Sequence, residues 1–166
     1  MSAQPASLRC APMTAATRGD ARVLLGAFLG EDAHYRASAA TYGDGGAVAL
    51  ERALDLFLNR SEIGFVWLTQ VQDGVSLQTV GACVVCYAIS TSRGSIVAKL
   101  DDVTIHADWR GRGVGRQMLS ALSQHLREQD IARIDCGCHR DNAGAWRFYE
   151  RMGFRPLDEE RIAMLL

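Results

Sequence analysis

The sequence predicts a single α/β domain in which helices flank a mixed, mostly antiparallel sheet. Its 166 residues are 48% apolar, which suits one domain of ordinary size with its own core. Residues 63–71 and 79–90 are rich in β-branched and aromatic side chains, and the turn sequence QDG between them predicts antiparallel neighbours. Strand and helix patterns then alternate toward the C-terminus, which is typical of an α/β arrangement.

The first third of the chain is predicted to be mainly helical. A short strand is expected at 8–13, followed by helices at 21–29 and 47–59, where apolar residues recur at helical spacing. Between these helices, residues 30–46 are rich in glycine, alanine and polar groups, which indicates a mobile loop or a helical turn.

The second half is predicted to contain a strand at 96–105, an amphipathic helix that opens near Val114, a strand at 133–138 and a helix at 143–152. One or two closing strands are expected within 154–166. We expect residues 1–7 to be a disordered tail and residues 8–166 to form the domain.

The composition gives no sign of a nucleic-acid or membrane partner. The formal net charge is −1, so the chain as a whole has no electrostatic attraction to nucleic acid or anionic lipid. No stretch approaches the roughly 20 apolar residues of a membrane span. Residues 1–13 lack the basic and apolar regions of a secretory signal, so we expect a cytoplasmic protein.

The five cysteines do not suggest disulfides or a metal. An odd number in a chain without an export signal argues against a disulfide framework. Cys83 and Cys86 are three residues apart on a predicted strand, so they should point to opposite faces and cannot share a metal. Cys136 and Cys138 share a face, but structural zinc ligands normally lie on turns. We therefore expect no metal site and buried thiols.

The most informative segment is a glycine-rich turn between the strand at 96–105 and the helix that follows. Gly111, Gly113 and Gly115 allow a tight turn that brings backbone N–H groups forward. The first N–H groups of a helix lack intrahelical partners, and the helix dipole adds partial positive charge there. Arg110, Arg112 and Arg116 add further charge, so the turn is predicted to hold an anion such as a pyrophosphate.

Other glycine-rich motifs fit this turn less well. A P-loop requires a Lys-Ser/Thr pair after the glycines, and none follows. A dinucleotide-binding turn needs a third glycine where Arg116 stands, although Asp135 lies at the offset of a ribose-binding acid. An RGG-type nucleic-acid segment would be repeated, whereas this one occurs once.

Two motifs together resemble the signatures of the GNAT (GCN5-related N-acetyltransferase) superfamily. RGRGVG is similar to its acyl-CoA signature, with Arg110, Gly113 and Gly115 at the fixed places. NAGAWRFYERMGF is similar to its second signature, at Asn142, Ala145, Phe148, Tyr149, Gly153 and Phe154. KLDDVTI also resembles a strand of the spermidine/spermine and thialysine acetyltransferase branch, with Asp101 in place of the usual glutamate.

The resemblance implies a fold with splayed central strands and acetyl-CoA as co-substrate, with no metal. The acetyl group would pass directly to a primary amine of a small molecule, such as a diamine, a polyamine or an amino-acid-like amine. The implied cofactor-binding residues are Val103, Thr104, Ile105, Arg110, Gly111, Arg112, Gly113, Val114, Gly115, Arg116, Asn142, Ala145 and Phe148.

The resemblance also implies the residues that transfer protons. Tyr149 would be the general acid, because a phenol is protonated at neutral pH and can give its proton to a leaving thiolate. Asp101 would be the general base, directly or through a water. Because adjacent strand residues point to opposite faces, only one of Asp101 and Asp102 should face the cleft, and Asp102 remains an alternative.

The acceptor site and the assembly are less constrained by the sequence. In the family, the connection between the first two helices lines the acceptor site. Here that connection contains Glu31, Asp32, His34, Tyr35, Tyr42 and Asp44, of which Glu31, Asp32 and Tyr35 are the main candidates to lie beside a cationic amine. A non-catalytic acyl-CoA-binding module and an enzyme acting on protein N-termini or lysines remain alternatives. The apolar segment 161–166 would form a covered edge strand, for which a homodimer is the favoured arrangement.

Overall fold

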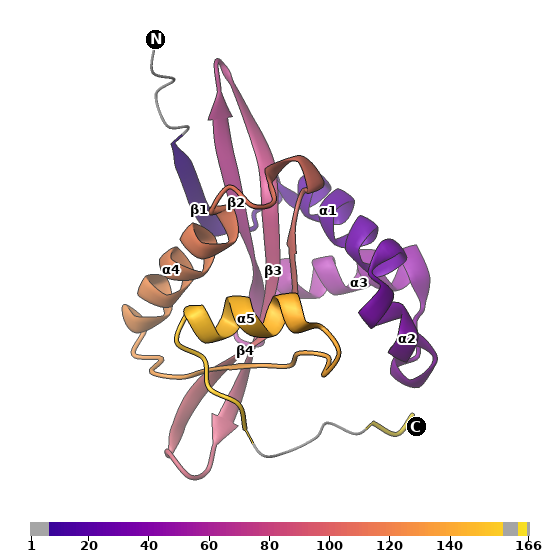
Figure 1. Ribbon diagram of the computed structural model, residues 1–166, viewed down its shortest axis with the longest axis vertical. Helices are drawn as coiled ribbons and strands as arrows, with labels where there is room; N and C mark the ends of the chain where they lie inside the picture. Colours follow the sequence, from indigo (N-terminus) through magenta and orange to yellow (C-terminus); the bar gives the residue numbers. More distant parts are fainter. Residues whose placement is uncertain (1–6, 158–162, 166) are drawn as a thin grey trace.

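The computed structural model describes residues 7–157 and 163–165, and its centre is one five-stranded sheet with the order β1-β2-β3-β4-β5 (Figure 1). The first four strands pair antiparallel, whereas β4 and β5 are parallel. The strands are β1 Leu8–Pro12, β2 Gly64–Asp73, β3 Ser76–Ser90, β4 Ser95–Ile105 and β5 Ile134–Cys136. The predicted fold class and the predicted hairpin of β2 and β3 are confirmed.

Helices cover both faces of the sheet (Figure 1). The helices are α1 Arg18–Glu31, α2 Ala33–Tyr42, α3 Gly46–Asn59, α4 Val114–Arg127 and α5 Ala143–Arg151, with a 3₁₀ turn at Ala107–Trp109. On one face, Leu25 and Leu54 of α1 and α3 pack with Val84 of the sheet. On the other face, Leu119 and Tyr149 of α4 and α5 pack in a separate core cluster with sheet residues that include Cys83 and Leu100.

The expected orientation of Cys83 and Cys86 is confirmed, whereas the expected burial of the thiols is only partly met, since Cys83 is buried and the other four cysteines are half-buried. Cys83 belongs to the core cluster beneath α4 and α5, whereas Cys86 packs against the cluster beneath α1 and α3. The two side chains therefore point to opposite faces of β3. Within the described residues, no group of three or more His, Cys, Asp or Glu side chains could hold a metal ion. Nor is any described helix long and apolar enough to cross a membrane.

The loop prediction for residues 30–46 is wrong, because most of this segment forms α2. Asp32 caps the helix by accepting a hydrogen bond from the Tyr35 backbone N–H at 2.8 Å, and Gly43 ends it in the left-handed conformation at φ 73°. Several alanines between these caps are strong helix formers. The composition suggested a loop, but the two caps were the better signal.

The closing strands expected within 154–166 are absent from the residues described there, 154–157 and 163–165. Leu165 instead lies against the end of α2, where a Cβ added to Gly43 would be 2.9 Å from its side chain. The other positions of the predicted closing strands, 158–162 and 166, lie outside the described residues. Residues 1–6 of the predicted N-terminal tail also lie outside them.

Candidate functional site

The glycine-rich turn forms an open cradle at the N-terminus of α4. Gly111 and Gly113 have φ of 71° and 79°, in the left-handed region that glycine adopts without strain. A Cβ at either position would meet nothing within 4 Å, so the backbone on this side is accessible to a ligand. Gly113 is the N-cap of α4, and the first N–H groups of the helix open into this cradle.

The arginines around the cradle are partly fixed by the protein itself. Arg110 donates a hydrogen bond from Nε to the carbonyl oxygen of Ile105 at 2.9 Å, which ties the turn to the end of β4. The guanidinium of Arg112 lies over the Trp109 ring, 5.3 Å from its centroid. Arg116 is exposed on the first turn of α4. The positive charge predicted at this turn is therefore present and accessible.

Two of the predicted cofactor residues are placed by packing. A Cβ on Gly115 would lie 3.4 Å from the Phe148 ring and 3.7 Å from Ile105, so this glycine allows α4, α5 and β4 to meet closely. Val114 is buried in a small cluster with Val71 and Val80, so only its backbone can contribute to the cradle.

Beside the cradle, β4 extends past the end of β5, in keeping with the strand separation that the family resemblance implied. Their ladder covers only three pairs, from Ala98 with Ile134 to Leu100 with Cys136, whereas β4 continues to Ile105 against β3. Residues 103–105 of β4 therefore have no partner in β5, and we call this edge, next to the glycine turn, the gap. Val103, Thr104 and Ile105 thus lie directly before the glycine turn in the chain.

A β-bulge changes the faces of the two aspartates. Asp101 lies opposite Val84 and Thr104 opposite Ala82, so two residues of β4 face the single Cys83 between them. Asp102 has φ of 48° at this bulge. The prediction that Asp101 and Asp102 point to opposite faces is therefore wrong: Asp101 shares the face of Val84, and Asp102 lines a cavity together with Val84.

That cavity, of about 230 Å³, lies on the face covered by α1, α2 and α3. Its polar groups are Tyr35, Tyr42, Asp44 and Asp102. Burial raises the pKa of Tyr35, and the negative charges of Asp44 and Asp102 raise it further, so both carboxylates act on this phenol. The cavity meets β4 at Asp102, directly before the edge residues 103–105.

The predicted acceptor residues are only partly brought together. Tyr35 lines the cavity. Asp32 caps α2, and Glu31 is exposed at the end of α1. Tyr42 and Asp44, which belong to the same predicted segment, also line the cavity: Tyr42 ends α2, and Asp44 follows it.

The predicted general acid lies on the other side of β4. Tyr149 is 9% exposed, and its ring packs against Phe148 and Phe154 at centroid distances of 5.3 Å. Burial raises the pKa of Tyr149, and its contact with the Cys136 thiol raises it further. Cys136 is the last residue of β5, so Tyr149 lies where the two strands begin to separate.

Asn142 has a structural contact at the start of α5. Its side-chain oxygen accepts a hydrogen bond from the Ala145 backbone N–H at 3.1 Å, which caps the helix. The loop before α5 also meets α2, since the rings of His34 and His139 have centroids 5.1 Å apart. Ala145 and Phe148 of α5 pack against the same core cluster as Val103 and Ile105 of β4, and Asn142 caps the start of that helix.

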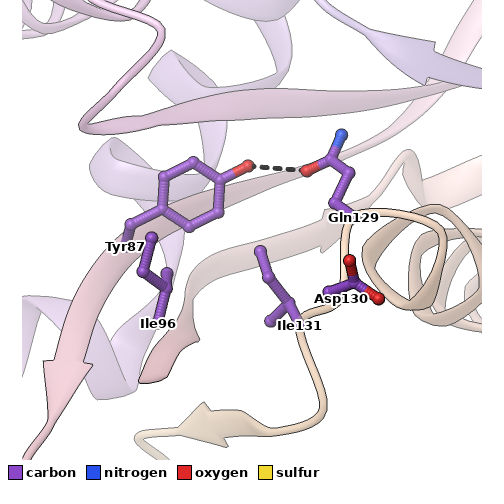
Figure 2. Close-up of a pocket in the computed structure, with 5 residues that line it drawn as sticks. All are labelled: Tyr87, Ile96, Gln129, Asp130 and Ile131. Atoms are coloured by element: carbon purple, nitrogen blue, oxygen red, sulfur yellow. Dashed lines mark hydrogen bonds between the residues drawn. The ribbon is translucent and has the colours of Figure 1, made fainter. Parts of the chain in front are cut away.

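A second cavity lies toward the opposite end of β4 (Figure 2). It has a volume of about 340 Å³, and Ile96 and Ile131 form part of its wall. The Tyr87 hydroxyl donates a hydrogen bond to the Gln129 side-chain oxygen at 3.1 Å across it (Figure 2). This cavity is remote in sequence from the glycine turn and lies beyond the C-terminal end of α4, so it is not part of the candidate site.

Comparison with known proteins agrees with this geometry. The model of the acetyltransferase (GNAT) family matches residues 49–154. The spermine/spermidine N(1)-acetyltransferase of Bacillus subtilis (strain 168) is 40% identical over 57 residues, which cover 34% of this chain and 38% of that protein. The chain thus spans between 30% and 38% of the length of such relatives.

Solved structures share the whole fold at low identity. The crystal structure of a probable acetyltransferase has a TM-score of 0.73 and 21% identity, with 95% of this chain and 97% of that chain covered. AAC(6')-Iy in complex with a bisubstrate analog has a TM-score of 0.73 and 13% identity, with 96% and 99% covered. At these identities the likeness shows the fold alone.

Proposed function

This chain belongs to the acetyltransferase (GNAT) family, and from that premise we propose that it transfers the acetyl group of acetyl-CoA to a primary amine of a small molecule. The observation that carries the proposal is the open glycine cradle at the N-terminus of α4, beside the edge of β4 where β5 departs. A pyrophosphate and an extended arm would bind together at such a place.

The residues of the cradle fit the co-substrate. Gly111 and Gly113 leave the space that a pyrophosphate would occupy, and Arg110, Arg112 and Arg116 balance its charge. Bound acetyl-CoA would supply an activated acetyl thioester at the gap. The backbone of Val103, Thr104 and Ile105 would hold the arm. The Ile105 N–H points away from β3, because the next N–H, that of His106, donates to Val80 of β3, so it is a candidate donor to the thioester carbonyl. Asn142, Ala145 and Phe148 would border it on α5.

Two side chains are proposed to handle protons. Tyr149 would hold a proton for the departing thiolate, and its raised pKa keeps the phenol protonated across the neutral range. Asp101 would accept the proton of the ammonium through a water, since it shares the face of the cavity. The amine would reach the gap from the cavity beside Asp102.

A non-catalytic acyl-CoA-binding module is the second candidate, because the cradle alone would suffice for binding. A thermal-shift series with acetyl-CoA, NAD and single-stranded RNA tests the ligand class, since a ligand of the folded state raises its stability. We expect acetyl-CoA alone to raise the melting temperature. Stabilisation by NAD or RNA instead would contradict the proposal, and release of free CoA only in the presence of an amine separates an enzyme from a binder.

A further inference from the structure

We propose that the cavity beside Asp102 accepts a primary amine with a single positive charge and a short apolar body, and that it discriminates against diamines and polyamines. This inference rests on the proposed acetyl transfer and names the acceptor class. It depends on how polar and apolar groups are distributed within the cavity.

The aromatic and acidic side chains of the cavity lining could together hold an ammonium group. Tyr35 and Tyr42 stack with ring centroids 5.9 Å apart and an interplanar angle of 16°. The carboxylates of Asp44 and Asp102 both act on Tyr35, so the two negative charges and the ring faces converge. Aromatic faces and carboxylates together favour a cation. Because Asp102 lies at the β4 bulge, an ammonium held there is next to the strand edge at the gap.

The rest of the cavity is apolar. Its wall includes Leu25 and Leu54, each 1% exposed, and Val66, which is fully buried. Phe57 contributes an aromatic ring from α3. A hydrocarbon body bound here would be removed from water against buried side chains, which stabilises it by about 0.8 kcal/mol per CH₂ group. The volume of about 230 Å³ limits that body to a small one.

A second ammonium group on the amine would have no counter-charge among the apolar residues of the cavity. Asp44 and Asp102 are the charged side chains among the described residues that line the cavity, and both lie close enough to Tyr35 to raise its pKa. A diamine held with one ammonium at Asp102 would place the other among leucine, valine and phenylalanine side chains. Burying an unpaired charge is strongly unfavourable, so the second charge should weaken binding rather than improve it.

The test compares hexylamine with 1,6-diaminohexane, which differ by one terminal ammonium on the same six-carbon chain. Initial rates of acetyl-CoA-dependent acetylation are measured for both, with spermidine as a third acceptor. We expect kcat/KM for hexylamine to exceed that for each of the other two by about tenfold or more. Acetylation of 1,6-diaminohexane or spermidine with equal or higher kcat/KM would overturn this inference and leave the proposed acetyl transfer intact.

A substitution in α3 tests where the hydrocarbon part of the bound amine lies. Ala53 is half-buried and lines the cavity, so Ala53→Asp would place a carboxylate where the second ammonium of a diamine would lie. We expect it to raise the kcat/KM ratio of 1,6-diaminohexane to hexylamine by about tenfold. Ala47→Asp, on the exposed first turn of the same helix, is the matched control and should leave the ratio unchanged.

The outcomes are distinguishable. An unchanged ratio in a folded Ala53→Asp protein would place the amine body elsewhere and overturn the inference. If no amine is acetylated although acetyl-CoA binds, the proposed transfer fails, and the acceptor class fails with it.

Discussion

Replacement of Gly113 by valine tests the cradle, because this residue is both the N-cap of α4 and an open position in the left-handed region. A β-branched residue at φ 79° costs about 1–2 kcal/mol in backbone strain. For a domain of this size, such a loss lowers the melting temperature by about 2–8 °C. The new side chain would also project into the space that the pyrophosphate needs.

The effect on binding should be larger than the effect on stability. If the valine displaces the pyrophosphate from two backbone N–H groups, the loss is about 3–6 kcal/mol, since a hydrogen bond to a charged group contributes about 1.5–3 kcal/mol. Acetyl-CoA affinity should therefore fall by about 10²-fold or more. Isothermal titration of acetyl-CoA into the folded variant measures this directly.

Gly94→Val is the matched control. Gly94 also has a positive φ, of 63°, and open space at its Cβ, but it lies in the turn between β3 and β4, away from the cradle. It should lower the melting temperature by a similar amount and leave acetyl-CoA affinity unchanged. Equal affinity of the Gly113→Val and Gly94→Val proteins would refute the cradle as the pyrophosphate site.

Three further predictions concern proton transfer and assembly. Tyr149→Phe should keep acetyl-CoA affinity and lower kcat by about 10²-fold, as measured by initial rates of CoA release. An unchanged kcat would mean that Tyr149 only packs in the core and does not donate a proton. Asp101→Asn should move the pH–rate profile to higher pH and change the KM for the amine little. Asp102→Asn should mainly raise the KM for the amine. The reverse pattern would mean that Asp102 is the base and Asp101 binds the amine. A homodimer through the C-terminal segment is expected, since Met164 and Leu165 are 80% and 62% exposed in the single chain. Light scattering of the full chain and of a chain lacking residues 164–166 checks this, and a full-length mass near 18.1 kDa would contradict it.

The glycine turn could be predicted from the sequence because its signal is local. Three glycines between a strand and an amphipathic helix leave few alternatives to an anion-binding helix N-terminus. The separation of β4 from β5 came from the resemblance to the family. The structure has the glycine turn at the N-terminus of α4, and the ladder of β4 and β5 ends at Leu100 and Cys136, whereas anion binding at the turn stays a prediction.

The cavity could not be predicted in the same way, because it depends on two features that periodicity does not reveal. The bulge at Asp102 interrupts the alternation of side chains along β4, so the rule for adjacent strand residues fails there. Helix α2 has no aliphatic side chain larger than alanine and none of its residues is buried, so its hydrophobic pattern is weak and only its caps at Asp32 and Gly43 indicated it. Without these two features, Asp102 and Tyr42 could not be placed beside Tyr35.

The most direct test of the account is an assay of the purified chain with acetyl-CoA and hexylamine. Free CoA is followed by thiol titration, and the amine is followed by mass spectrometry in the same reaction. The account predicts that free CoA and N-acetylhexylamine form in equal amounts and that both are lost in the Gly113→Val protein but not in the Gly94→Val protein. Release of CoA without an acetylated amine, or equal activity in both variants, would contradict it.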